Sequence, residues 1–173
     1  MEKRPEIIVL TGPESTGKTY LAENLAFVFK ASWMPEYARE YIENLNRPYK
    51  YRDLEKIAKK QQAELLEIKK FDNKFVFLDT YLIITKIWFL EVFNKCPDWI
   101  DIELKEFDPC LFLLCNFDLP WEKDKVRENK HKREYLFNRY LMELEYYKFS
   151  YEIISGDRPN RLNLAVDIIQ KFY

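Results

Sequence analysis

The chain has 173 residues, a formal net charge of −1 at pH 7, 47% hydrophobic residues and 33% charged residues. This length favours one domain, 1–173, with a substantial core, and the near-neutral charge gives no electrostatic reason to expect nucleic-acid binding. No apolar stretch is long and charge-free enough to span a membrane. Cys96, Cys110 and Cys115 lack C-x-x-C spacing and there is a single histidine, which predicts reduced thiols, no zinc site and a cytoplasmic location.

The first predicted strand, 6–11, is an apolar, β-branched run that leads into the segment TGPESTGKTY, residues 11–20. This segment holds two of the three glycines and matches the phosphate-binding pattern G-x-x-x-x-G-K-[ST]. A helical pattern follows at 18–30, which is the context that such a loop needs. Lys18 is expected to reach the outer phosphates and Thr19 to bind Mg²⁺. The predicted nucleotide-binding residues of this segment are Gly12, Pro13, Glu14, Ser15, Thr16, Gly17, Lys18, Thr19 and Tyr20.

Further strands and helices alternate along the rest of the chain. The expected strands are 6–11, 32–35, 74–79, 109–115 and 150–155, and the expected helices are 18–30, 36–45, 51–71, 80–95, 131–148 and 160–172. Such alternation predicts an α/β fold with a central parallel sheet of five strands between two layers of helices. In a sheet of this kind the ligand lies outside the carboxyl ends of the strands, which makes the residues closing each strand candidates for function.

Two strand ends carry candidate catalytic carboxylates. Asp79 closes the third strand and is expected to bind Mg²⁺, although an N-cap of the next helix is an alternative role. Glu36 and Arg39 follow the second strand, one helical turn apart. Glu36 could accept the proton of an attacking hydroxyl and Arg39 could hold substrate; the spacing fits a simple surface ion pair equally well.

The stretch 118–134 is polar and charged after Trp121 and is a candidate lid, at about 118–133. Arg127 and Arg133 are its best candidates for phosphate contacts, whereas interleaved acidic residues also fit a solvated loop of balanced charge. Candidates for stacking on a flat ring are Tyr37, Tyr41, Tyr81, Trp88 and Trp121, and for each of them core packing is the favoured alternative. The loop at 155–162 could contact adenine, but an ordinary turn followed by a helix start is favoured for most of it.

Four segments in this order and spacing, GPESTGKT, WMPEYAREY, FLDTYLIITKIW and PWEKDKVREN, closely resemble the ribosylnicotinamide kinase domain of the NadR family. The resemblance covers residues 6–170. It implies a P-loop fold of the nucleoside-kinase type and ATP-dependent phosphorylation of nicotinamide riboside at its 5′-hydroxyl, giving nicotinamide mononucleotide. On this sequence it implies that residues 12–19 hold the triphosphate and Mg²⁺, and that Arg127 and Arg133 act from the lid.

This chain departs from the family pattern in two respects. Where the family often has Asp-Thr-Asp, this chain has Asp79-Thr80-Tyr81, which leaves Glu36 and Asp79 as the strand-end carboxylates for base and metal. An adenylyltransferase domain is not expected in this sequence, so a single phosphorylation step is predicted.

The resulting hypothesis is an ATP- and Mg²⁺-dependent nucleoside kinase. Lys18 and Arg127 stabilise the transferring phosphoryl group, and Glu36 acts as the base, with Asp79 as the second choice. The predicted substrate-binding residues are Glu36, Tyr37, Arg39, Asp79, Trp88 and Trp121. The alternatives are a kinase of another nucleoside or of a nucleotide, and a regulatory module that binds ATP without useful turnover. The sequence predicts no oligomeric state.

Overall fold

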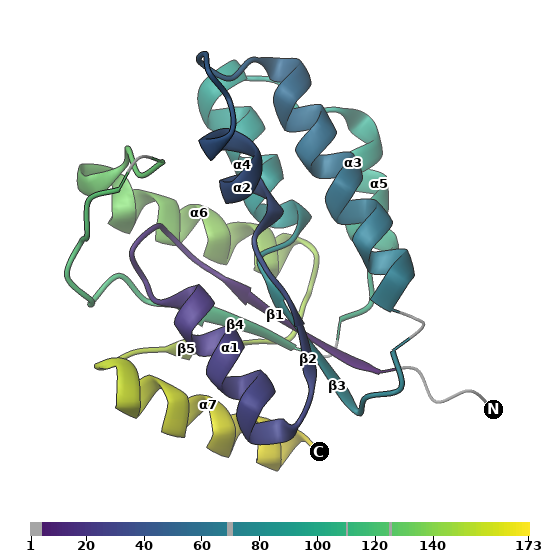
Figure 1. The fold of residues 1–173 in the computed structure, drawn as a ribbon, viewed down its shortest axis with the longest axis vertical. Helices are drawn as coiled ribbons and strands as arrows, with labels where there is room; N and C mark the ends of the chain where they lie inside the picture. Colours follow the sequence, from purple (N-terminus) through teal and green to yellow (C-terminus); the bar gives the residue numbers. More distant parts are fainter. Residues whose placement is uncertain (1–4, 69–70, 110, 125) are drawn as a thin grey trace.

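The computed structural model describes residues 5–68, 71–109, 111–124 and 126–173. Within these residues five parallel strands form one sheet in the order β2-β3-β1-β4-β5 (Figure 1). The strands are β1 (Glu6–Thr11), β2 (Ser32–Met34), β3 (Phe75–Asp79), β4 (Leu111–Cys115) and β5 (Tyr151–Ile154). In the register of the central strands, Leu10 of β1 faces Asp79 of β3 and Leu113 of β4. The predicted five-stranded parallel sheet is therefore confirmed.

The apolar strand residues alternate between the two faces of the sheet, because successive side chains of a strand point to opposite sides. Ile8 and Leu10 of β1 pack with α1 (Lys18–Phe29) and α7 (Arg158–Phe172), which form one helical layer. Val9, between them, packs in the second layer. Both faces are thus covered, as in a doubly wound fold, and Figure 1 shows α1 and α7 on one side of the sheet.

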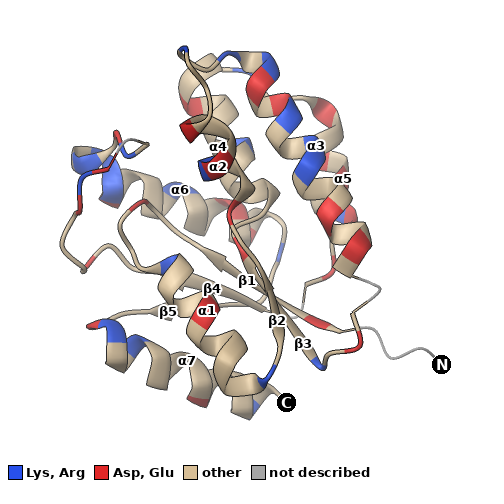
Figure 2. Ribbon diagram, in the orientation of Figure 1, with Lys and Arg blue, Asp and Glu red and all other residues tan. Residues whose placement is uncertain are grey.

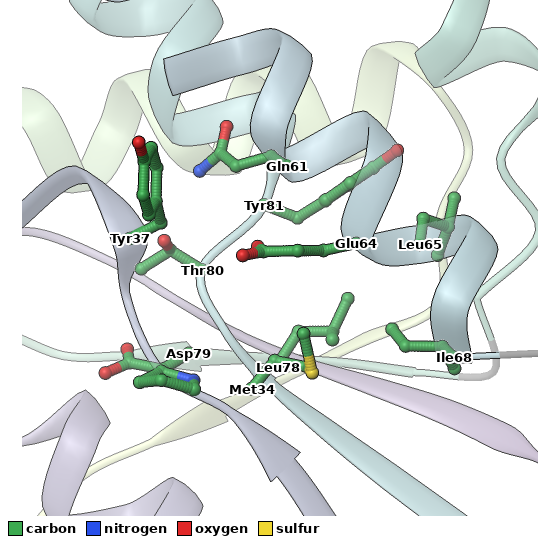
Figure 3. Close-up of a pocket in the computed structure, with 11 residues that line it drawn as sticks. Met34, Tyr37, Gln61, Glu64, Leu65, Ile68, Leu78, Asp79, Thr80 and Tyr81 are labelled. Atoms are coloured by element: carbon green, nitrogen blue, oxygen red, sulfur yellow. The ribbon is translucent and has the colours of Figure 1, made fainter. Parts of the chain in front are cut away.

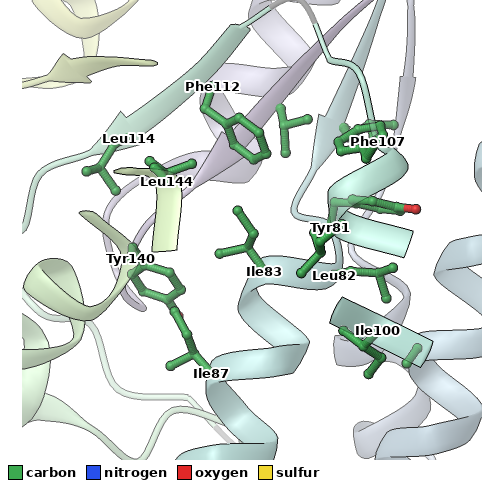
Figure 4. Close-up of a cluster of buried hydrophobic side chains, with 14 of the residues drawn as sticks. Tyr81, Leu82, Ile83, Ile87, Ile100, Phe107, Phe112, Leu114, Tyr140 and Leu144 are labelled. Atoms are coloured by element: carbon green, nitrogen blue, oxygen red, sulfur yellow. The ribbon is translucent and has the colours of Figure 1, made fainter. Parts of the chain in front are cut away.

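The second layer contains α2 (Tyr37–Glu43), α3 (Tyr51–Ile68), α4 (Leu82–Phe93), α5 (Asp98–Glu106), the 3₁₀ turn η1 (Lys130–Lys132) and α6 (Arg133–Tyr146). Figure 4 shows part of its core, in which Tyr81 and Ile83 at the start of α4 meet Phe107, Phe112 and Tyr140. The rings of Tyr81 and Phe107 lie 4.5 Å apart between centroids. Much of the high aromatic content therefore serves packing.

The sequence analysis was wrong about one element, because it missed α5. Pro97 occupies the N-cap, Asp98 and Asp101 lie in the first turn and Lys105 in the last. These residues complement the helix dipole and are typical helix boundary signals. With nine residues, α5 presents only Ile100 and Leu104 as buried positions, which is too short a pattern for helical periodicity to stand out.

The remaining boundaries differ by a few residues. The helix expected at 131–148 starts as η1 and continues as α6, and α4 starts at Leu82 because Thr80 takes the left-handed conformation, with φ of 74°. Cys115 is buried and Cys96 partly buried, and both are free thiols. Cys110 and Lys125 lie outside the described residues. No helix in the described ranges has the length and apolarity needed to cross a membrane.

Candidate nucleotide and substrate site

The loop between β1 and α1 has the backbone of a phosphate cradle. Gly12 has a φ of 134°, and an added Cβ would lie 2.6 Å from the carbonyl oxygen of Cys115 on β4. Gly17 has a φ of 77° and forms the N-cap of α1. The Thr16 hydroxyl donates to the Pro13 carbonyl at 2.8 Å and closes the loop. Both glycines are therefore required by geometry, and the loop leads into a helix N-terminus, where anions bind.

The lysine and threonine that end the motif point toward the carboxyl ends of the strands. Lys18 Nζ donates to the Pro13 carbonyl at 2.7 Å, and Thr19 Oγ1 donates to Asp79 Oδ2 at 2.5 Å. Asp79 is 2% exposed. Its Oδ1 atom is buried and has no hydrogen-bond partner among the described residues.

This arrangement fits a bound Mg²⁺. That ion is commonly held by one or two carboxylates together with substrate phosphates and waters, and a buried carboxylate oxygen without a protein partner supplies such a ligand. Thr19 and Asp79 would hold the ion. The alternative role of Asp79 as the N-cap of α4 is wrong, because Tyr81 occupies that position.

Glu36 and Arg39 come from the start of α2, beside the same strand ends. Arg39 Nε lies 3.9 Å from Glu36 Oε2, so the predicted i,i+3 pair is present. Burial raises the pKa of Glu36, and the charge of Asp79 raises it further against the opposing effects of Lys18, Arg39 and Arg127. Burial likewise raises the pKa of Asp79, against Lys18 and the Thr19 hydrogen bond. Two such carboxylates next to one lysine are typical of a catalytic site.

A cavity of about 440 Å³ connects these groups. Gly12, Glu14, Ser15, Lys18 and Thr19 of the phosphate loop line one end, and Glu36 and Arg39 line the wall. The opposite end is more apolar, and its lining includes Ile42, Tyr49, Ile84, Ile87, Trp88, Val92, Leu136 and Tyr140. A cavity that runs from a phosphate cradle to an aromatic and aliphatic end can hold a phosphate donor and a flat organic group together.

Trp88 and Tyr49 form the aromatic part of this end. Their rings lie edge to face, with centroids 5.0 Å apart, and Trp88 Nε1 donates to the Tyr49 hydroxyl at 3.1 Å. Trp88 was predicted as a substrate residue, whereas Tyr49 was missed. The carboxylate of Glu91 lines the same part of the cavity, and Arg47, which lies in the segment between α2 and α3, lines it too.

Residues 118–124 and 126–133, which we call the lid segment, lie against the phosphate loop. Glu14 accepts hydrogen bonds from the backbone N–H groups of Glu128, at 3.0 Å, and Asn129. Ser15 Oγ accepts from the Glu122 N–H at 3.1 Å. Arg133 Nη1 donates to the carbonyls of Leu119, at 2.8 Å, and Ser15, at 3.3 Å. Glu14 and Ser15, which occupy unspecified positions of the phosphate-binding pattern, therefore bind the lid segment.

Arg127 of the lid segment lines the cavity, and Figure 2 shows basic residues gathered in this segment and at the start of α6. Its Nη1 donates to the Glu122 carbonyl at 2.7 Å and its Nε lies 2.9 Å from Asp124 Oδ2. The interleaved acidic residues are therefore partners of the basic ones. Both interpretations of this segment, charge balance and access to phosphate, fit the same geometry.

Other predicted residues lie outside the large cavity. Tyr37 and Asp79 line a smaller cavity beside α3 (Figure 3). Asp79 accepts a hydrogen bond from Thr19, which lines the larger cavity. Trp121 lies near Glu14, with Nε1 3.5 Å from its Oε1, and the Tyr20 ring lies 5.6 Å from the Arg158 guanidinium carbon. The loop at 155–162 is a turn followed by α7, as expected, with Asp157 as its N-cap.

Tyr81, the departure from the expected Asp-Thr-Asp, does not face the large cavity. Its side chain is 3% exposed, points away from Asp79 in Figure 3 and packs on Phe107. It therefore adds no polar group to the site.

Sequence reasoning missed three residues that organise the site. Asp53 accepts hydrogen bonds from Tyr41, Arg47 and the Lys50 N–H. Asp124 pairs with Arg39 and Arg127. Arg161, 1% exposed, donates to the carbonyls of Thr16, Asn116 and Gly156. Burial distinguishes Asp53 and Arg161, and a contact with Arg39 across 85 residues distinguishes Asp124. Neither feature is visible in the sequence.

Comparison with known proteins identifies the family. The family model described as AAA domain matches residues 7–161. The chain belongs to this AAA domain family. Two curated relatives are the trifunctional NAD biosynthesis/regulator proteins NadR of Salmonella typhimurium and Escherichia coli, 26% and 27% identical over 124 residues. The alignments cover 69% of this chain and 30% of each relative, so the match spans less than a third of those proteins.

Several solved structures share the fold of this domain. The structure of NadR protein in complex with NR has a TM-score of 0.84 at 23% identity and covers 99% of this chain and 51% of its own. A deoxyadenosine kinase from M. mycoides has a TM-score of 0.71 at 13% identity, covering 95% and 99%. The expected resemblance to NadR and the three-layer kinase-like fold are confirmed.

Proposed function

We propose that this chain is an ATP-dependent kinase that phosphorylates nicotinamide riboside at its 5′-hydroxyl. The observation that carries the proposal is the single cavity that joins the phosphate loop to the Tyr49 and Trp88 rings, with Glu36 in its wall. A nucleoside with a cationic ring suits an end that offers aromatic faces and the Glu91 carboxylate. The curated NadR relatives and a solved structure of NadR protein in complex with NR support this substrate.

The roles of the residues follow from their positions. Lys18 and Arg127 would stabilise the negative charge of the transferring phosphoryl group. Glu36 would accept the proton of the 5′-hydroxyl as its oxygen bonds to the γ-phosphorus and the bond to the β–γ bridging oxygen breaks, releasing ADP. Thr19 and Asp79 would hold Mg²⁺, which neutralises phosphate charge when bound. The other side chains act by positioning, which supplies most of the catalysis in such transfers.

The raised pKa of Glu36 suits the role of base. A carboxylate whose pKa is raised toward neutral pH is a stronger base than one at its ordinary value. Asp79 is the second choice, since its Oδ2 atom already accepts from Thr19.

The first experiment measures ADP release with ATP and Mg²⁺ against nicotinamide riboside, uridine, thymidine, adenosine and their monophosphates. We expect selective turnover of nicotinamide riboside, lost in Lys18→Ala and Glu36→Gln and kept in Lys171→Ala, which changes an exposed lysine of α7. Selective turnover of another compound would overturn the substrate and keep the chemistry. ATP binding without any turnover would overturn the kinase proposal in favour of a regulatory module.

A second comparison tests how the ring is recognised. Reduced nicotinamide riboside has nearly the same size but a neutral ring. We expect its KM to exceed that of the cationic form by about tenfold, as the loss of a cation–π contact of about 1–2 kcal/mol predicts. Trp88→Leu should remove most of this difference. Equal KM values for the two forms in the unmodified enzyme would contradict the proposed recognition.

A further inference from the structure

Asp124 of the lid segment lies between two arginines from different parts of the chain. Its Oδ2 atom is 2.9 Å from Arg39 Nη1 on α2 and 2.9 Å from Arg127 Nε in the lid segment. Its Oδ1 atom accepts a hydrogen bond from the Val126 N–H at 2.9 Å. One carboxylate thus has partners on α2 and on its own segment, and its side chain is 28% exposed.

Both arginines line the large cavity. Two guanidinium groups that share a site repel each other, and a carboxylate between them removes that repulsion and fixes their separation. Arg39 has two further acidic neighbours, Glu36 at 3.9 Å and Glu43 at 3.6 Å. The other partners of Arg127 lie in its own segment, where its Nη1 atom donates to the Glu122 carbonyl and lies 3.8 Å from Glu122 Oε2.

The lid segment is attached to the rest of the molecule in several places, and two of these attachments involve residues that line the large cavity. Glu14 and Ser15 attach it to the phosphate loop through backbone groups of residues 122, 128 and 129. Asp124 attaches it to α2, across 85 residues of sequence. The first attachment lies on the side of the phosphate donor and the second beside Glu36, on the side of the acceptor.

We propose that Asp124 is a positioning residue that holds Arg127 and Arg39 in place at the cavity and fastens the lid segment onto α2. The proposal rests on the proposed phosphoryl transfer, in which Arg127 stabilises the transferring group. Loss of Asp124 leaves the Glu14 attachment intact but frees Arg127 to leave the cavity. The chemical step is therefore impaired far more than the binding of ATP.

The test is a double-mutant cycle with Asp124→Asn and Arg127→Ala, run on whichever panel nucleoside the unmodified enzyme phosphorylates. We expect Asp124→Asn to lower kcat by about 30- to 100-fold and to change the KM for ATP by less than threefold. In the Arg127→Ala background the same change should lower kcat by less than threefold, because the positioned group is absent. Glu134→Gln, an exposed carboxylate at the start of α6, serves as the control and should keep kcat within twofold.

A readout without substrate separates this proposal from the proposed function. The lid segment contains Lys123, Arg127, Lys130 and Lys132, so trypsin reports its attachment. We expect cleavage in this segment to be at least fivefold faster in Asp124→Asn than in the unmodified protein or in Glu134→Gln, with an unchanged circular dichroism spectrum.

The kinetic and proteolysis results together distinguish the role of Asp124 from the proposed kinase activity. Equal kcat losses in both backgrounds, or cleavage at the unmodified rate, would overturn the role of Asp124 while leaving the kinase proposal in place. A protein without turnover of any nucleoside, but with cleavage that depends on Asp124, would overturn the kinase proposal and keep the attachment.

Discussion

At the scale of single residues, Glu36 shows how catalysis and stability make opposite demands. Its pKa is raised in the folded protein, mainly by burial and then by the charge of Asp79. The native state therefore binds this proton more tightly than the unfolded chain does. By linkage, the free energy of unfolding falls as pH rises from about 4.3, the ordinary value for glutamate, through the raised pKa. The raised pKa of Glu36 thus makes the free energy of unfolding lower at neutral pH than below pH 4.3.

We predict that Glu36→Gln loses activity and gains stability. The kcat should fall by about 10²- to 10⁴-fold, as for a lost general base, and Tm at pH 7 should rise by about 2–4 °C for each kcal/mol recovered. The acid limb of kcat/KM in the unmodified enzyme should lie above pH 4.3. Glu40→Gln on the exposed side of α2 is the control, and a Tm that falls in Glu36→Gln alone would contradict the argument.

Gly12 is the position at which the fold most clearly excludes any side chain. An added Cβ meets the Cys115 carbonyl oxygen at 2.6 Å, a contact with backbone that cannot move aside cheaply. We predict that Gly12→Ala raises the Kd for ATP at least tenfold, measured by calorimetry. Gly156→Ala is the matched control, because its φ of 99° is also unfavourable for alanine but its Cβ would only approach Asn160 Cβ at 3.4 Å. Gly156→Ala should lose stability and keep its affinity for ATP. Equal Kd values for ATP in Gly12→Ala and Gly156→Ala would refute the prediction.

At the scale of elements, the segment between α2 and α3 depends on one buried carboxylate. Asp53, 1% exposed, accepts from Arg47 at 2.7 and 2.9 Å, from the Lys50 N–H at 2.7 Å and from Tyr41 at 2.9 Å. The hydrogen bonds from Arg47 hold the pKa of Asp53 well below its usual range, against the effect of burial. Its contribution to stability is therefore present above about pH 3.9 and is lost as pH falls below that value.

We predict that Asp53→Asn costs about 1–3 kcal/mol at pH 7, because a buried amide cannot replace the charge-assisted hydrogen bonds that the carboxylate accepts from the exposed Arg47 and from the Lys50 N–H. Chemical denaturation should show this loss shrinking as pH falls below about 3.9. The segment also carries Tyr49 into the aromatic end of the cavity, so the KM for the nucleoside should rise about tenfold with little change in kcat. Asp72→Asn, an exposed aspartate, is the control. A loss of stability with an unchanged KM would show that Tyr49 is positioned independently.

The sequence was sufficient for the elements whose determinants are local. The phosphate loop, the strand before it and the alternation of strands and helices follow from neighbouring residues, and the structure places Glu36, Asp79 and Lys18 together as the strand ends predicted. Tyr49 and Asp124 were missed because their partners lie 39 and 85 residues away in the sequence. Helix α5 was missed for a local reason, since nine residues give too few turns for a pattern.

At the scale of the whole molecule, Arg161 joins three loops at the carboxyl edge of the sheet. It donates to Thr16 O of the phosphate loop at 3.1 Å, to Asn116 O after β4 at 3.0 Å and to Gly156 O after β5 at 2.6 Å, and it pairs with Asp118. Its side chain comes from α7, in the layer on the far side of the sheet from α2. One buried guanidinium therefore connects that layer to the loop that cradles phosphate.

We predict that Arg161→Met lowers both the stability and the gain in stability on ATP binding. Three carbonyls and Asp118 lose their donor, so about 3–5 kcal/mol should be lost, which corresponds to a fall in Tm of about 6–20 °C. If the phosphate loop is also displaced, the rise in Tm with saturating ATP shrinks because the Kd increases. Arg158→Met, whose side chain is 53% exposed, is the control and should change the free energy of unfolding by less than about 1 kcal/mol. A large loss of stability with an unchanged rise in Tm on ATP binding would mean that Arg161 supports the fold without setting the shape of the phosphate loop. A smaller rise in Tm on ATP binding would show that α7 is one of the elements that determine how the nucleotide is held.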